Sequence, residues 1–145
     1  FPSPYYAGLV KFEGECDRLQ YYELRIPSIA INKSVYTPAG TGGPDKPPVD
    51  KTYINLSYNF MTPVNEGHTR YFWFQHRNTD PNYEVVSKFM NDGARMAFEE
   101  DRAILTEVDR GMRDRQTPNI DLRLDAGSKL FRKQLQQQID SENGK

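Results

Sequence analysis

One acidic residue, Asp101, is unusual because it falls in the middle of an apolar helical pattern. The run from Tyr83 to Met112 contains no proline and repeats apolar residues at steps of three and four, which is typical of one helix face. Counted from Asp101, that face contains Ala94, Ala97, Phe98, Ile104, Leu105 and Val108. A buried charged carboxylate is costly unless a cation, a metal or hydrogen bonds compensate it. Asp101 is therefore a candidate for a metal ligand or for a member of a buried ion pair.

A purely structural role for Asp101 is the alternative. The same helix carries many other charged residues, and a small rotation of the apolar face would place Asp101 at its edge, in water. Arg70, Arg77 or Arg95 could also neutralise the carboxylate, and ion-pair networks account for many such acids. The spacing agrees with each of these roles.

The other residue types that could do chemistry do not combine into a site. His68 and His76 are the only histidines, and on one extended strand they would lie about 26 Å apart, too far to share a metal ion. The single cysteine, Cys16, excludes an internal disulfide and a cysteine-held zinc or iron–sulfur site, and it fits a reducing cytoplasm. The sequence has no Gly-x-Ser-x-Gly elbow for acyl transfer and no glycine loop that leads into a helix to bind phosphate.

Composition limits the classes of protein further. The formal net charge of −1 gives no electrostatic reason to expect nucleic acid or an acidic membrane as a partner. No apolar run approaches transmembrane length. A chain of 145 residues fits one domain, whose core volume would come largely from its Phe and Tyr residues and one Trp.

The elements that must position Asp101 begin with antiparallel strands. Strand-like residues cover 19–36, with a break near Pro27, and the Pro- and Gly-rich stretch 37–50 is expected to be a flexible loop. The next strand, 52–61, alternates, so that one face carries Ile54, Leu56, Tyr58 and Phe60. The other face carries Tyr53, Asn55, Ser57 and Asn59, and we expect the two asparagines to contact solvent or another subunit. The aromatic-dense strand 69–77 would pair with 52–61 as a hairpin.

A long helix is expected after the strands. Thr79 or Asp80 can cap its N-terminus, with Pro81 in the first turn, and the helix would run to about Arg113. A glycine at position 93 could bend it. Strands followed by a long helix predict an α+β fold, in which helices pack on one face of a curved antiparallel sheet. The aromatic side chains between sheet and helix could enclose an apolar pocket or fill it.

The C-terminal part is expected to contain one more helix. Residues 117–124 read as extended, and Asp125 can cap a helix that ends near Ile139. Its inward-facing residues would be Leu130, Phe131, Leu135 and Ile139. Residues 140–145 are expected to form a frayed tail.

Four segments, in order along the chain, resemble one protein family. They are Val35–Gly40 (VYTPAG), the aromatic strand Tyr71–Asn78 (YFWFQHRN), Phe98–Asp101 (FEED) with an acid at Glu107, and Leu124–Ser128 (LDAGS) leading into Phe131–Lys133. From about Tyr21 to Ile139 the chain is similar to the C-terminal part of the catalytic domain of Rieske non-haem iron oxygenases of the vanillate O-demethylase type.

This resemblance implies a helix-grip (Bet v 1/START-like) half-domain and a mononuclear Fe(II) held by two histidines and one carboxylate. By motif position the carboxylate is Asp101, and such a site leaves open positions for dioxygen beside the substrate. The resemblance would place Phe98 and Ala97 next to the iron, where a substrate ring could rest on them. His76 could hydrogen-bond a substrate carboxylate. Ordinary core packing for the first two, and a surface position for the histidine, are the alternatives.

The resemblance also implies partners and a reaction. Electrons would come from a Rieske [2Fe–2S] cluster in the parent protein, fed by a flavin reductase that uses NAD(P)H. The parent would hydroxylate an aromatic carbon or O-demethylate a methoxylated aromatic acid with O2. Proteins of this family usually form trimers. We therefore expect a cytoplasmic homotrimer that binds an aromatic small molecule and neither nucleic acid nor a membrane.

Two sets of family motifs are missing from the chain. It has no His-x-x-x-x-His segment for the other two iron ligands, and no Cys-x-His and Cys-x-x-His pair for the Rieske cluster. We therefore interpret residues 1–145 as a single domain, the C-terminal portion of an oxygenase catalytic domain. It would be inactive alone, and would be either a fragment of a complete enzyme or a shortened relative. The alternatives are a non-catalytic module that binds an apolar small molecule between sheet and helix, and a role in subunit assembly.

Overall fold

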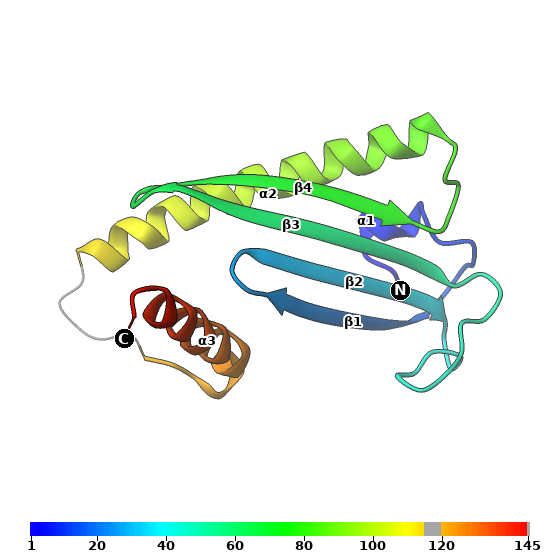
Figure 1. Ribbon diagram of the computed structural model, residues 1–145. Coiled ribbons are helices and arrows are strands. Elements are labelled where there is room, and N and C mark those ends of the chain that lie inside the picture. Colours follow the sequence, from blue (N-terminus) through cyan, green and yellow to red (C-terminus); the bar gives the residue numbers. More distant parts are fainter. Residues whose placement is uncertain (115–119, 145) are drawn as a thin grey trace. The chain divides into compact units, whose positions relative to one another are not determined.

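The computed structural model describes residues 1–114 and 120–144, and the chain divides into two compact units. The first unit comprises Phe1–Pro81 and Leu130–Lys145, and the second comprises Asn82–Lys129. A four-stranded sheet forms most of the first unit and a long helix most of the second (Figure 1). This content confirms the α+β class that the sequence predicts.

The sheet is a curved antiparallel meander in which each strand pairs with the next one along the chain (Figure 1). Its strands are β1 (Cys16–Arg25), β2 (Ile29–Pro38), β3 (Tyr53–Asn65) and β4 (His68–Arg77). Both the break near Pro27 and the β3–β4 hairpin agree with the sequence-based expectation. The hairpin closes where Asn65 Oδ1 accepts a hydrogen bond from Gly67 N at 3.0 Å. Pro63 lacks an amide hydrogen, and the ladder is irregular between Pro63 and Asn65, where a missing donor is tolerated.

The register of β3 sorts its residues onto two faces, as the alternation predicts. The apolar face is the side of the sheet that carries Ile54, Leu56, Tyr58 and Phe60. The polar face is the side that carries Tyr53, Asn55, Ser57 and Asn59. Pairing extends both faces across the sheet, so that Ile31 and Phe74 flank Tyr58 on the apolar face.

The polar face is the more deeply buried of the two. Tyr36 and Tyr53 are fully buried there and Asn55 is 2% exposed, whereas Phe74 on the apolar face is 42% exposed. The expectation that the asparagines of β3 contact solvent is therefore wrong for Asn55. Asn59 is half-buried, and its Nδ2 donates a hydrogen bond to a backbone carbonyl of β2 at 3.2 Å.

A short N-terminal helix accounts for part of this burial. Residues 1–14 are expected from the sequence to be irregular, but they contain α1 (Pro4–Ala7). The ring of Tyr6 packs on the polar face, with its centroid 4.7 Å from that of Tyr36 and 5.9 Å from that of Tyr53. Aromatic contacts of this kind exclude water from the end of the face where the loop between β2 and β3 begins.

The second unit is built on α2 (Glu84–Arg113), one helix of 30 residues that continues through position 93. Its N-cap is Tyr83, so the prediction that Thr79 or Asp80 caps it, with Pro81 in the first turn, is wrong. Asp80 has a φ of 45°, a left-handed conformation in which a right-handed helix cannot start. The Arg77 guanidinium fixes this turn, because it donates to the carbonyls of Thr79 at 2.9 Å and Asp80 at 2.8 Å.

The last helix also starts differently from the expectation. Of the stretch predicted to be extended, residues 117–119 lie outside the described residues. A 3₁₀ turn, η1 (Arg123–Asp125), precedes α3 (Ala126–Glu142). Asp125 Oδ2 accepts a hydrogen bond from Leu122 N at 2.7 Å, so its carboxylate closes η1 and does not cap α3 as predicted.

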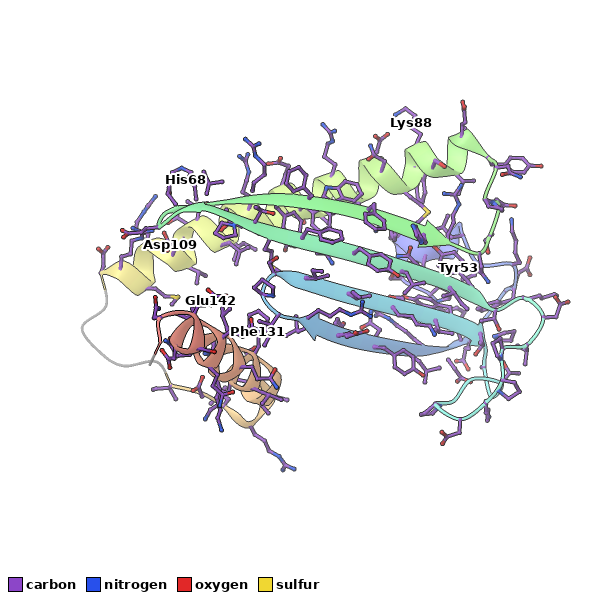
Figure 2. All side chains as sticks on the ribbon, in the orientation of Figure 1. Tyr53, His68, Lys88, Asp109, Phe131 and Glu142 are labelled. Atoms are coloured by element: carbon purple, nitrogen blue, oxygen red, sulfur yellow. The ribbon has the colours of Figure 1, made fainter. Side chains whose placement is uncertain are left out.

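The helix α3 continues past Ile139 into the stretch expected to fray. None of its residues is buried. Phe131, labelled in Figure 2, and Leu135 are half-buried, whereas Leu130 and Ile139 are exposed. Among the described residues, no helix combines the length and apolar character that crossing a bilayer requires.

Candidate functional site

Most acids in the C-terminal half of α2 are neutralised within the helix. Three of them form exposed ion pairs with an arginine one turn further on: Glu99 with Arg102 at 2.6 Å, Glu107 with Arg110 at 3.0 Å, and Asp109, labelled in Figure 2, with Arg113 at 2.8 Å. Pairs of this kind contribute only a few tenths of a kcal/mol each. Their consequence for the site is that these acids already have a cation beside them.

Asp101 has no such partner within α2. The residues three and four positions away, where a cation could reach it, are Ala97, Phe98, Ile104 and Leu105. Among the described residues of this helix, the Asp101 carboxylate forms no hydrogen bond or ion pair, and its side chain is exposed. Neutralisation by Arg95, on the same helix, is therefore not observed. An unpaired carboxylate between apolar neighbours can accept a metal ion as an oxygen ligand.

The two predicted substrate contacts on α2 lie next to Asp101. Ala97 and Phe98 are one turn before it on the same face, Ala97 exposed and Phe98 half-buried. One turn after it, Ile104 is 62% and Leu105 63% exposed. The helix thus presents a single carboxylate within an apolar surface that an aromatic ring could contact.

The third predicted substrate contact, His76, belongs to the other unit. It lies near the end of β4 on the apolar face, opposite Leu56, and is exposed. The centroid of its ring is 5.2 Å from that of Phe74 and 5.5 Å from that of Tyr58. Each unit is described by itself, so Ala97, Phe98 and Asp101 are brought together on one helix and His76 is part of a separate aromatic cluster.

A group of buried polar atoms on the polar face was missed from the sequence. Asn32 Oδ1, Tyr53 OH and Asn55 Oδ1 are buried and have no hydrogen-bond partner among the described residues. The great majority of buried polar groups are paired, but each of these three atoms has less than 1 Å² exposed, so the packing of the polar face closes them to a ligand. Burial, reinforced by the neighbouring Tyr6, raises the pKa of the Tyr53 phenol, which therefore stays protonated and able to donate at neutral pH.

The sequence does contain a signal for this group. Asn55, Ser57 and Asn59 occupy alternate positions of one strand, so they form a polar row. A polar row opposite an apolar one ordinarily faces solvent in an antiparallel sheet. The contact with Tyr6 reverses that rule at one end of the row, and such a contact between distant segments has no local signature.

The described residues do not bring a complete set of metal ligands together. Within residues 1–114 and 120–144, no three His, Cys, Asp or Glu side chains lie close enough together to hold a metal ion. A metal bound at Asp101 would take its other ligands from outside the part of the chain that the structure describes.

Residues 1–141 match the family model of the vanillate O-demethylase oxygenase C-terminal domain. The chain belongs to this family. The match covers all four segments that carry the resemblance in the sequence, and it confirms that resemblance. Membership makes an unpaired carboxylate on the long helix of this oxygenase C-terminal domain the first residue to examine for metal binding.

Two curated relatives of this oxygenase C-terminal domain come from Comamonas testosteroni. One is TsaM1, the iron-sulfur subunit of a toluene-4-sulfonate monooxygenase system, and the other, TsaM2, is named as a candidate for the same kind of subunit. Each is 29% identical to this chain over 143 residues, which is 98% of this chain. The chain spans 41% of the length of these relatives. No solved structure matches the chain.

Proposed function

We propose that this chain forms the C-terminal part of the catalytic domain of an oxygenase that oxidises an aromatic acid with O2, by ring hydroxylation or O-demethylation. The family match and the names of the relatives support the oxygenase class. The observation that carries the proposal within this chain is the unpaired carboxylate of Asp101 in the apolar face of α2.

Asp101 fits the carboxylate position of a mononuclear Fe(II) site. Carboxylate oxygen is one of the three protein ligands in the two-histidine-one-carboxylate arrangement, and this carboxylate has no competing cation on its own helix. The two imidazoles would come from outside this chain. When bound, the iron would supply the activation of dioxygen, and its electrons would come from a Rieske cluster and a reductase that are also outside the chain.

The remaining side chains of α2 would bind and orient the substrate. Phe98 and Ala97 supply apolar surface one turn from the proposed ligand, where a ring can lie flat and exclude water from the reacting carbon. A half-buried Phe contributes to such binding through the apolar area it covers. An acid group on the ring would need separate polar contacts.

Two sets of polar side chains compete for that acid group. His76 was predicted for this role from the strand end, but it lies on the apolar face, whereas Tyr53 and Asn55 lie on the polar face. Residues on opposite faces of a sheet cannot line the same pocket. Asn55 Oδ1 is an acceptor, which cannot bind an anion, and both this atom and Tyr53 OH are closed to solvent. His76 is exposed and a ring N–H can donate, so we propose His76 as the contact to the substrate anion. Homotrimer formation and a flavin reductase partner remain predictions that the family resemblance implies.

Iron analysis of the full-length protein tests the proposal. Asp101→Ala should lower bound iron by about tenfold or more, because a ligand of a three-residue site is lost. Glu100→Ala is the matched control: it removes the adjacent exposed acid and should leave the iron content unchanged. Circular dichroism verifies that both variants are folded. Iron retained at the wild-type level in Asp101→Ala would reject Asp101 as a ligand, and no iron in the wild-type protein would favour the non-catalytic ligand-binding module.

A further inference from the structure

A cavity of about 160 Å³ lies between the apolar face of the sheet and the connection from β2 to β3. Its floor is one row of side chains across three strands, because Leu19 of β1 pairs with Val35 of β2, and Val35 pairs with Ile54 of β3. The connection supplies the other wall, which includes Pro44, Pro47 and Pro48. All of these side chains are apolar, so the main part of a ligand in this cavity must be apolar too.

Specific bonds hold the connection in this place. Gly42 N donates to Asp17 Oδ2 of β1 at 2.8 Å, and Lys46 Nζ donates to the carbonyl of Gly40 at 2.9 Å. A Cβ on Gly42 would lie 2.6 Å from Thr37 Oγ1, so even alanine would not fit there without a shift. These contacts fasten the connection to the strands, and the cavity is therefore a defined space within the first unit.

Most polar side chains that line the cavity cannot contact a ligand. Thr41 and Thr52 each donate from Oγ1 to the backbone carbonyl three residues earlier, at 2.6 Å and 2.7 Å. The ammonium group of Lys46 is bound to the carbonyl of Gly40, as described above. The Thr37 hydroxyl has less than 1 Å² exposed, so the packing around it closes it to the cavity. Of the polar side chains in the walls, only Lys33 is left.

Lys33 lies in the row of side chains next to the floor, opposite Tyr21 of β1 and Leu56 of β3. It is half-buried, and its ammonium group lies 5.5 Å from the centroid of the Tyr21 ring. Among the described residues this ammonium group forms no ion pair and no hydrogen bond. A partly buried cation is stabilised when an anion lies beside it. The cavity thus combines an apolar floor with one cationic contact, which favours a ligand with a single negative charge.

The walls favour an aliphatic ligand over a ring. Tyr21 is the only aromatic side chain among the described residues that line the cavity, and the Lys33 ammonium already lies over it. Branched aliphatic walls provide van der Waals contact but no ring face on which an aromatic ligand could stack. The aromatic side chains of this face gather elsewhere, where Tyr58, Phe74 and His76 lie 4.8–5.5 Å apart. A cavity of about 150 Å³ holds a molecule of about six carbon atoms.

We propose that this cavity binds a short-chain aliphatic carboxylate of about six carbon atoms. The carboxylate pairs with the Lys33 ammonium, and the alkyl chain lies along Leu19, Val35 and Ile54 beneath the connection. Binding of such an acid requires neither iron nor turnover, so it can be measured whether or not the proposed oxygenase function holds.

Calorimetric titration of the full-length protein with hexanoate tests the charged contact. Lys33→Met should weaken binding by about tenfold, the effect of losing one charge-assisted hydrogen bond. Methionine keeps an unbranched apolar side chain at this position, so the fold should be retained. Lys133→Met, on an exposed lysine of α3 that does not line the cavity, should leave binding unchanged. Equal affinities of the wild type and Lys33→Met would overturn the proposal.

A series of ligands tests the apolar part of the cavity. From butyrate to hexanoate the affinity should rise about fourfold for each added methylene, and it should stop rising beyond hexanoate, when the chain no longer fits. Hexylamine carries a cation in place of the anion and should not compete with hexanoate. Benzoate should compete only at concentrations above those of hexanoate itself. Equal affinities for butyrate and hexanoate, competition by hexylamine, or stronger competition by benzoate than by hexanoate would contradict an aliphatic acid site.

Discussion

The two faces of the sheet show the same strict alternation along β3 but opposite burial. The polar face, with Tyr53 and Asn55, is nearly inaccessible, and the apolar face leaves Phe72 and Phe74 about half exposed. Apolar residues usually fill the interior and polar residues the surface, so the reversal needs a reason. Tyr6 packs on Tyr36 and Tyr53, so the contact with the N-terminal segment, and not the polarity of the residues, decides which end of the sheet is buried.

The comparison is first tested by removing one tyrosine from each face. Tyr53→Ala should lower the free energy of unfolding by about 4 kcal/mol, as for other large core side chains, because Tyr53 is fully buried against Tyr6 and Tyr36. Tyr58→Ala on the apolar face should cost about 1–2 kcal/mol, because its ring is only half-buried. Urea denaturation of the full-length protein measures both. Equal losses would contradict the difference in burial.

The positions of the strands could be predicted because their signals are local. Alternation from Thr52 onward fixes which residues share a face of β3, and the proline-free run after Tyr83 fixes α2. Which face is buried could not be predicted, because it depends on the contact of Tyr6 with Tyr36 and Tyr53. Tyr6 is 30 and 47 residues away from them in sequence, and local periodicity carries no information on such a contact.

The start of α2 and the complete metal site could not be predicted from the sequence, for two different reasons. Thr79 and Asp80 are good N-cap residue types, but the hydrogen bonds of Arg77 to their carbonyls hold them in a turn. Asp101 could be selected by its place among apolar residues, but its side chain is exposed, as in the alternative that places it at the edge of that face, in water. Its other ligands could not be predicted because this chain offers no further candidates within reach among the described residues.

A smaller loss of stability is expected for a substitution in the loop between β2 and β3, where Gly42 contacts the sheet. Gly42→Ala should destabilise the protein by about 1–3 kcal/mol, the cost of forcing an extra carbon into a packed site, because its Cβ would lie 2.6 Å from Thr37 Oγ1. Gly8→Ala is the matched control, since no atom lies within 4 Å of an added Cβ there. The midpoints of urea denaturation of the two variants measure the difference in stability. If Gly42→Ala is as stable as Gly8→Ala, the loop is not closed against the sheet.

Alkaline pH should destabilise the polar face selectively. Burial raises the pKa of Tyr5 from 10 to about 12, and it also raises the pKa of Tyr36 and Tyr53. A raised pKa means that the unfolded state loses its proton first, so stability is complete below pH 10 and is lost as pH rises through about 12. Tyr53→Phe should make this decline shallower, whereas Tyr22→Phe, 70% exposed, should not. The free energies of unfolding of the wild type and both variants, measured at a series of pH values, test this prediction.

The smallest effect on stability is expected for Asn55→Leu. This variant also tests which face of the sheet contacts the substrate. Leucine has a similar volume and removes a buried carbonyl oxygen that has no partner, so the free energy of unfolding should change by less than about 1 kcal/mol. KM for an aromatic acid should also stay unchanged in the complete enzyme, because Asn55 Oδ1 is an acceptor that is closed to solvent and cannot contact the substrate anion.

His76→Phe is the matched variant on the other face of the sheet, and it should raise KM by about tenfold, because the proposed hydrogen bond to the substrate carboxylate is lost. The reverse result, a raised KM for Asn55→Leu and an unchanged KM for His76→Phe, would move the substrate contact to the polar face. Because the two side chains leave neighbouring strands on opposite sides, one pocket cannot use both, and the pair of measurements therefore assigns the substrate to one face. A stable Asn55→Leu protein with a raised KM would mean that the unpartnered polar atoms of the buried face are kept for the ligand and not for the fold.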